Sequence, residues 1–276
     1  MPAASRGDGP RYPLTQDEIA AFQRDGYVHL PAVLSAEEVA QLELVVDRFF
    51  RREIPVPGKD YCDMSGDYTR SPEQFAVLNV MLPRKYWPAL QGNVYEQRAA
   101  HIAEQLCGAG MVLDYDQLLA KRPFRADAVF HWHQDLAYWP VTADPRTASF
   151  WLAIDDSTID NGCVRFIPGS HRERRLRPHL PMLGDRDQSH TLVAQVDEQR
   201  ELIRPAELRR GDLTVHHERI VHGSGGNHTQ SWRRAYIMAF RSATTVAEER
   251  RLGFTHSHND EKSVLDSVAA LKSESR

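Results

Sequence analysis

The start of the chain carries two segments whose apolar side chains recur at the three- and four-residue spacing of an amphipathic helix. A capping box precedes each segment, formed by Thr15 with Glu18 and by Ser35 with Glu38. In a capping box, each of the two side chains accepts a hydrogen bond from a backbone N–H group at the start of the helix. The pattern therefore predicts two helices, and Gly26 ends the first of them.

Three neighbouring stretches follow other patterns. Residues 27–30 alternate apolar and polar side chains, as a short strand does, and residues 95–106 predict a third helix that Gly108 ends. Residues 52–75 carry Pro, Gly, Asp and Ser without periodicity and predict a long loop. Long loops in compact domains often cover a site, so this loop and residues 172–200 are the candidate lids.

From residue 111 the chain changes to short β-rich runs separated by turns. Asn161-Gly162 is a strong signal for a two-residue hairpin. Strands of this length and spacing predict a sandwich or barrel rather than a parallel sheet with crossover helices. We therefore expect a mainly β fold with flanking helices. The predicted strands are 111–119, 128–132, 148–154, 163–167, 192–196, 212–216 and 235–241, and a last helix is expected over about 262–272.

Composition limits the partners that the chain can have. A length of 276 residues suits one barrel with added helices, and we predict a disordered tail, residues 1–13, before a single domain, residues 14–276. The formal net charge of −4 favours binding neither to nucleic acid nor to an anionic membrane. We interpret the basic run 171–177 as a solvated loop rather than a nucleic-acid site. No stretch resembles a signal peptide or a membrane span. Three scattered cysteines argue against disulfides, so we expect a cytoplasmic protein, a monomer or a homodimer.

A metal-ligand pattern ends one of the predicted strands. His133 and Asp135 are two residues apart, so on a strand both side chains point to the same face and can bind one ion. His131 and His133 are an alternative pair. This pair supplies two ligands, so a third ligand must come from elsewhere in the chain. Two histidines and one carboxylate leave open positions at iron(II) for oxygen chemistry. The downstream candidates are His216, His217 and His222.

His222 is the preferred third ligand because a glycine-rich turn follows it and a strand then returns through residues 232–236. This arrangement can bring an arginine beside the metal. If 2-oxoglutarate binds the metal through its keto and C1 carboxylate oxygens, its distal carboxylate needs a fixed cation, and arginine offers two parallel hydrogen bonds. Arg233 and Arg234 compete for this role, because neighbours on a strand point to opposite faces.

At this point the residues resemble the phytanoyl-CoA dioxygenase family of iron(II)/2-oxoglutarate oxygenases. The order and approximate spacing of its motifs agree over about residues 15 to 245. The matching segments are Asp25-Gly26-Tyr27-Val28, His133-Gln134-Asp135, Trp151 with Asp155, Asn161-Gly162, Pro168-Gly169-Ser170-His171, Gly211-Asp212, and His222-Gly223-Ser224 through Asn227 to Arg233.

The resemblance implies a double-stranded β-helix, a cupin-like jelly-roll barrel of two antiparallel sheets. It also implies metal ligands at His133, Asp135 and His222, and the cofactors Fe(2+), 2-oxoglutarate and O2. Five residues would contact the cosubstrate: Arg233 by a salt bridge, Ser224 by a hydrogen bond, Trp151 as a wall, and Tyr115 and Gln117 more loosely.

The expected reaction is hydroxylation of a small organic molecule, coupled to decarboxylation of 2-oxoglutarate to succinate and CO2. Halogenases that resemble the family replace the ligand carboxylate, whereas Asp135 is present here. The substrate is open: a secondary metabolite is favoured, and a fatty acyl-CoA or an amino-acid-like molecule is the alternative. Desaturation, epimerisation and ring closure also stay open. The candidate substrate residues are Trp132, Tyr138, Trp139, Arg146 and Glu218.

Two other function classes fit part of the pattern. A zinc hydrolase could use the same three ligands with Glu218 as its acid or base, but it does not require Arg233 and Ser224. A catalytically silent barrel would be supported by loss of a ligand residue, and none is lost.

Overall fold

A computed structural model describes residues 6–260. The helices are α1 Gln16–Asp25, α2 Ala36–Phe50, α3 Pro83–Tyr86, α4 Val94–Cys107 and α5 Ala243–Arg251, with short 3-10 turns η1 Gly58–Asp60, η2 Pro88–Leu90, η3 Asp135–Ala137 and η4 Ser170–Arg172. The strands are β1 Tyr27–Leu30, β2 Tyr61–Asp63, β3 Val77–Met81, β4 Met111–Lys121, β5 Phe130–His133, β6 Thr147–Ala153, β7 Val164–Phe166, β8 His179–Pro181, β9 Leu192–Ala194, β10 Arg204–Ala206, β11 Leu213–His216, β12 His222–Ser224 and β13 Arg233–Ser242.

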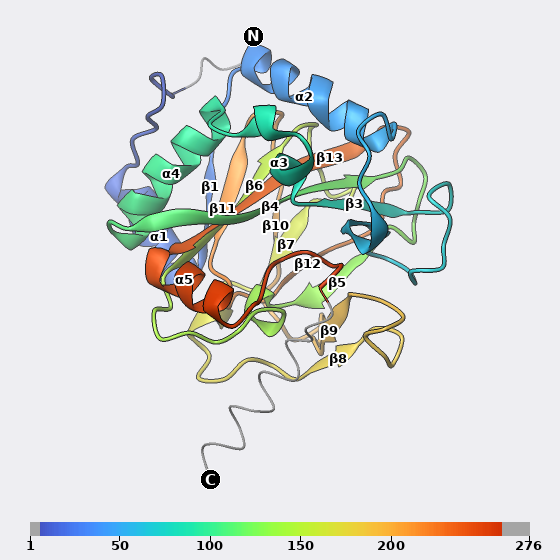
Figure 1. The fold of residues 1–276 in the computed structure, drawn as a ribbon. Coiled ribbons are helices and arrows are strands. Elements are labelled where there is room, and N and C mark those ends of the chain that lie inside the picture. Colours follow the sequence, from blue (N-terminus) through green and yellow to red (C-terminus); the bar gives the residue numbers. More distant parts are fainter. Residues whose placement is uncertain (1–5, 261–276) are drawn as a thin grey trace.

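The strands form two main sheets, and every pairing in them is antiparallel. The larger sheet has the order β1-β11-β6-β13-β4-β3-β2, the smaller has β10-β7-β12-β5, and β8 pairs with β9 separately. Figure 1 shows α1, α2 and α4 on the side of the larger sheet that faces away from β5, β7 and β12. The predicted double-stranded β-helix with flanking helices is confirmed.

Alternation along the central strands gives the larger sheet its two faces. On β6, Phe150 and Leu152 pack in the core beneath the helices, whereas Trp151 and Ala153 pack in the core between the two sheets. Successive side chains of a strand point to opposite faces, so the odd-numbered residues of β6 face the interior of the barrel. The same parity holds on β13, where Tyr236 faces the helices. The interior of the barrel is therefore built from alternate residues of strands that are buried on both faces.

The predicted elements differ from the structure in three places. The loop predicted for 52–75 contains η1 and β2, and five short strands were not predicted: β2, β3, β8, β10 and β12. The hairpin at Asn161-Gly162 is wrong, because β6 and β7 belong to different sheets and the turn lies in the connection between them. Within the predicted tail, Tyr12 is fully buried and donates a hydrogen bond to the carbonyl oxygen of Pro31 at 2.7 Å.

Some predictions lie beyond what these elements test. The helix expected over 262–272 falls outside the described residues. The single domain over 14–276 stays a prediction. Among residues 6–260, no helix has the length and apolar character needed to cross a membrane.

Candidate functional site

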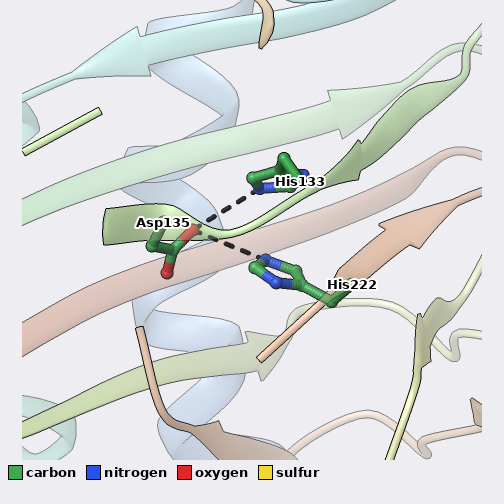
Figure 2. Close-up of side chains that lie close together, drawn as sticks. All are labelled: His133, Asp135 and His222. Carbon is green, nitrogen blue, oxygen red and sulfur yellow. Dashed lines mark ion pairs between the residues drawn. The ribbon is translucent and has the colours of Figure 1, made fainter. Parts of the chain in front are cut away.

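Two strand ends and one 3-10 turn bring the predicted metal ligands together. His133 ends β5, Asp135 begins η3, and His222 begins β12 directly opposite His133 in the pairing of the two strands. Asp135 Oδ1 lies 3.4 Å from His133 Nε2 and 3.5 Å from His222 Nε2 (Figure 2). The three ligand atoms all lie within 4.8 Å of one another. This spacing allows one ion to contact all three.

Hydrogen bonds set which atom of each side chain faces the centre. His133 Nδ1 lies 2.8 Å from the backbone oxygen of His131, and His222 Nδ1 lies 3.1 Å from that of Ile220. A carbonyl oxygen only accepts, so each Nδ1 carries the proton and each Nε2 presents its lone pair to the centre. Such backbone-oriented imidazoles are typical of metal ligands.

The carboxylate of Asp135 is oriented in the same way. Its Oδ2 lies 3.3 Å from His216 Nε2 and accepts a hydrogen bond from Ser149 Oγ at 3.1 Å, so Oδ1 is left toward the two imidazoles. The structure thus separates the candidate third ligands: His222 joins the cluster, and His216 contacts the other carboxylate oxygen. His217 Nδ1 instead accepts a hydrogen bond from the backbone N–H of Arg219.

The protonation states also suit a cation. Burial opposes ionisation of Asp135, but the imidazole of His222, with those of His133 and His216, outweighs it and holds the pKa of Asp135 well below its ordinary value. Burial, with the neighbouring His133, lowers the pKa of His222 well below its ordinary value. One carboxylate and two neutral imidazoles form the donor set of a facial triad for iron(II), so the residues fit this metal.

Residues around the triad fix its backbone. The Gln134 side chain donates to the carbonyl oxygen of Arg219 at 2.6 Å and accepts from the backbone N–H of Arg177 at 2.8 Å. Gly223 on β12 lies so close to β5 that a Cβ there would be 3.1 Å from the Phe130 oxygen. These contacts hold the two strand ends that carry the ligands against each other.

A cavity of about 850 Å³ extends from the triad. It is large enough for two small molecules, a cosubstrate and an organic substrate. Loops 58–68 and 186–190 and the segment 254–260 all contribute side chains to its wall, so both candidate lid regions reach it. The predicted residues that line it are Tyr115, Gln117, Tyr138, Trp139, Trp151, Ser224 and Arg233.

Two buried basic side chains lie beside each other here: Arg233 lines the cavity, and Lys121 contacts the lining residue Ser224. Arg233 on β13 is 2 % exposed and pairs across the sheet with Lys121 of β4, which is fully buried. The Arg233 guanidinium lies over Trp151, 5.1 Å from the ring centroid, and its Nε has no hydrogen-bond partner. Lys121 Nζ donates to Ser224 Oγ at 2.7 Å and to the backbone oxygen of Gly225. Within residues 6–260, no carboxylate pairs with either cation.

This charge arrangement calls for an anion. Burial lowers the pKa of Arg233 to about 10, and burial together with Arg233 lowers the pKa of Lys121 well below its ordinary value. Buried charges without a partner are strongly destabilising, and a bound carboxylate would compensate them. Arg234, the competitor of Arg233, points away and pairs with Asp155 at 2.6 Å and with acidic residues of α2.

Lys121 was missed in the sequence. It has the same strand parity as Gln117 and Leu119, which line the cavity. A lysine on the inward-facing side of an otherwise apolar strand was the signal that could have identified it.

Three of the predicted substrate residues lie elsewhere. Trp132 packs with Ile167 and Val221, and its indole N–H donates to Glu198 at 2.7 Å. Arg146 pairs with Asp144 at 2.8 Å, with a side chain that is 38 % exposed. These two residues do not line the cavity, and their contacts are structural.

Glu218 does not line the cavity either. It is 2 % exposed and pairs with Arg241 at 3.2 Å. That placement removes the acid or base that the zinc-hydrolase alternative required.

A second acidic group lies beside the cavity wall. Asp114, Glu249 and His256 bring potential ligand atoms together, but Arg241 pairs with Glu249 and Arg250 pairs with Asp114. Because the arginines already neutralise the carboxylates, this cluster is an ion-pair network rather than a metal site.

Comparison with known proteins places these features in context. The profile of the family "Phytanoyl-CoA dioxygenase (PhyH)" matches residues 22–235. An ectoine dioxygenase of Stutzerimonas stutzeri (strain A1501) is 25% identical over 249 residues, which cover 84% of this chain and 78% of that protein. The crystal structure of EvdO2 from Micromonospora carbonacea var. aurantiaca, complexed with 2-oxoglutarate, superposes with a TM-score of 0.67 and 29% identity, covering 84% of this chain and 92% of EvdO2. The epimerase SnoN, in complex with Fe3+, alpha ketoglutarate and nogalamycin RO, superposes with a TM-score of 0.63 and 26% identity, covering 83% of this chain and 84% of SnoN.

Proposed function

Because this chain belongs to the phytanoyl-CoA dioxygenase family and is an iron- and 2-oxoglutarate-dependent dioxygenase, we propose that His133, Asp135 and His222 hold its iron. We further propose that Arg233, Lys121 and Ser224 bind the distal carboxylate of 2-oxoglutarate. The reaction is hydroxylation of a small organic molecule, coupled to formation of succinate and CO2.

The observation that carries the proposal is the buried pair Arg233 and Lys121: Arg233 lines the cavity of the triad, and Lys121 donates a hydrogen bond to Ser224 in the cavity wall. A metal centre alone would suit several enzyme classes, including hydrolases. A hydrolase has no need of two buried basic side chains without a carboxylate partner beside the metal cavity, whereas the distal carboxylate of a dicarboxylate cosubstrate would compensate them. Burial strengthens their attraction for that carboxylate, since little water competes for it.

The chain's own residues orient and shield the reactants. Bound iron(II) supplies the site at which oxygen is activated at the expense of 2-oxoglutarate. Arg233 and Lys121 fix one end of the cosubstrate, and the Trp151 ring packs beside Arg233. Ser149 and His216 keep Asp135 in one orientation. The aromatic wall that includes Tyr138 and Trp139 excludes water, which protects a reactive centre from side reactions.

Asp135 also bears on the outcome of the reaction. It occupies the carboxylate position of the triad, so no position is left for a halide, and we favour oxygen transfer over halogenation. Epimerisation and ring closure use the same centre with another substrate placement, and the similarity to the epimerase SnoN keeps them as the second candidate.

The test is an anaerobic titration of the protein with iron(II) and 2-oxoglutarate, followed by the visible absorption band of the chelate. Wild type is expected to form the band, Arg233→Ala to need far more 2-oxoglutarate, and the exposed control Arg251→Ala to match wild type. His222→Ala is expected to lose iron binding, and His217→Ala to keep it. An absent band, or equal 2-oxoglutarate affinity in Arg233→Ala, would refute the cosubstrate assignment.

We also propose that the protein acts in the cytoplasm, as a monomer or a homodimer. Its three cysteines are all unpaired, which suits a reducing compartment. Fractionation of the native host and size-exclusion chromatography coupled to light scattering test these two statements separately.

A further inference from the structure

The outer part of the cavity differs in character from the region around Arg233 and Ser224. It is walled by Tyr138 and Trp139, by residues 186–190, by residues 58–68 and by residues 254–260. Apart from the short edge strand β2 within 58–68, these segments are turns and loops rather than strands of the two sheets. Loops on a rigid barrel are where substrate selection is commonly built.

Three aromatic rings form a ladder along this wall. The rings of Tyr138 and His190 are stacked at 5.1 Å between centroids, and those of His190 and His258 are stacked at 3.7 Å. The other end of the ladder reaches the metal centre, because the Tyr138 ring lies 5.8 Å from that of His133. A flat apolar substrate packed along this ladder would extend from the iron toward the loops.

One guanidinium belongs to this ladder and has an unused donor. Arg186 lies over the Tyr138 ring at 5.4 Å, and its Nη2 is 3.4 Å from His190 Nδ1. Its Nη1 is buried without any hydrogen-bond partner. Asp187 and Asp260 lie on the same cavity wall, but neither forms an ion pair with Arg186, and Asp260 accepts a hydrogen bond from Thr255.

The neighbouring imidazoles do not add to this charge. Burial, with His258, lowers the pKa of His190 well below its ordinary value, and burial lowers the pKa of His258 to about 3. Both rings are neutral near pH 7. Burial also lowers the pKa of Arg186, but a guanidinium keeps its proton throughout the physiological range. Arg186 is therefore the charged side chain in contact with the ladder, whereas Lys59, which also lines this wall, lies over the Tyr68 ring.

A purely structural cation–π contact would explain the position of Arg186 over Tyr138. It does not explain a buried N–H group left without an acceptor, since such a group is costly unless a ligand or water completes it. Arg186 lines the cavity, its Nη1 is without a partner, and Nη2 has a second N–H beyond the one that can contact His190. A carboxylate matches these two donors with two parallel hydrogen bonds.

We propose that the substrate is an aromatic or otherwise planar organic acid, whose carboxylate Arg186 binds while its ring packs against Tyr138 toward the iron. This inference rests on the proposed function and names the substrate class of the same site. Arg186 is then a specificity-determining residue, and the acid group lies at the end of the substrate away from the oxidised carbon.

The test uses matched acids and amides as probes: 3-phenylpropionate, trans-cinnamate and indole-3-acetate, each against its primary amide. The protein is first loaded with iron(II) and 2-oxoglutarate without oxygen, and probe binding is followed by the perturbation of the chelate band and by calorimetry. Wild type is expected to bind at least one acid about tenfold or more tightly than its amide. Arg186→Gln is expected to bind the two forms equally, and Arg186→Lys to keep part of the preference.

Two controls separate the possible failures. Arg186→Gln is expected to bind 2-oxoglutarate as wild type does, and Arg251→Gln, an exposed arginine outside the cavity, to keep the full acid preference. A missing chelate band in wild type would overturn the proposed function itself. This inference alone would be overturned by any of three results obtained with a normal chelate band. These are that no acid binds, that acids and amides bind equally, or that Arg186→Gln keeps the preference for the acid.

Discussion

The buried amine of Lys121 leads to a prediction about protons taken up when the cosubstrate binds. The side chain has no exposed surface, and burial together with Arg233 holds the pKa of Lys121 well below its ordinary value. In the free protein this shift favours the neutral amine, whereas a carboxylate bound beside the amine favours the charged form. Binding of 2-oxoglutarate is therefore expected to raise the lysine pKa and to take up a proton from solution.

The size and pH range of the effect follow from this shift. The uptake at this position is at most one proton per site and falls between the lowered pKa of the free protein and the ordinary lysine value of about 10.4. In the same range the unfolded chain binds more protons at Lys121 than the folded chain, so the stability of the free protein rises with pH. Loss of one charge-assisted hydrogen bond in Lys121→Met is expected to weaken 2-oxoglutarate binding about 10- to 150-fold, or about 1.5–3 kcal/mol.

The assay is anaerobic calorimetry of 2-oxoglutarate binding to the iron(II) protein in buffers with different ionisation enthalpies. The dependence of the measured heat on the buffer gives the number of protons taken up. Wild type is expected to show uptake that Lys121→Met lacks, and Lys85→Met, an exposed lysine that does not line the cavity, to behave as wild type. Equal proton uptake in Lys121→Met and wild type, or a loss of affinity below about twofold, would refute the reasoning.

Three further predictions concern the surroundings of the site. Arg241→Met removes a buried partner from the carboxylates of Glu249 and Glu218, so urea unfolding is expected to show a loss of about 3–5 kcal/mol. A change below about 1 kcal/mol would contradict the ion-pair network. Burial opposes protonation of His256, but Asp114 and Glu249 outweigh it and raise the pKa of His256. The contribution of the protonated His256 to stability is therefore complete below about pH 6.5 and is lost as pH rises through the raised pKa. A pH profile of unfolding that is unchanged in His256→Gln would exclude this role. Gly223→Ala places a Cβ 3.1 Å from the backbone of β5, so the affinity for iron is expected to fall. An anaerobic titration measures it, and an affinity equal to that of wild type would show that the close contact between the strands is not needed.

Periodicity and capping in the sequence were sufficient for the longer elements. The capping boxes at Thr15 and Ser35 are both present, and β4 and β13 begin within two residues of their predicted starts. Strands of three residues, such as β12, are too short to show alternation, so His222 could be chosen only from the glycine-rich turn after it. The hairpin signal at Asn161-Gly162 failed because it reports the local turn and not the sheet to which the next strand belongs.

The same limit explains which site residues could be found in advance. The triad contains a local pair, His133 and Asp135, two residues apart where β5 passes into η3, and Arg233 followed from the return strand. The partners of Lys121 and Arg186 are not local: Lys121 lies across the sheet from Arg233, and Arg186 meets a ring that comes from a turn before β6. Such pairings depend on the register of strands and on loop positions, which one sequence without its fold does not specify.

The division between strands and loops also predicts how this enzyme can change. The proposed iron ligands lie at the end of β5, in η3 and at the start of β12, and Arg233 and Lys121 are the paired end residues of β13 and β4. Substitutions there disturb the pairing of two sheets along with the chemistry. The outer cavity wall comes largely from turns and loops, including residues 186–190 and 254–260, where a side chain can change without disturbing a ladder of backbone hydrogen bonds. Changes at Arg186 are therefore expected to alter which molecule is oxidised while leaving iron and 2-oxoglutarate binding intact. Changes at Lys121 are expected to weaken 2-oxoglutarate binding while leaving the choice of substrate intact.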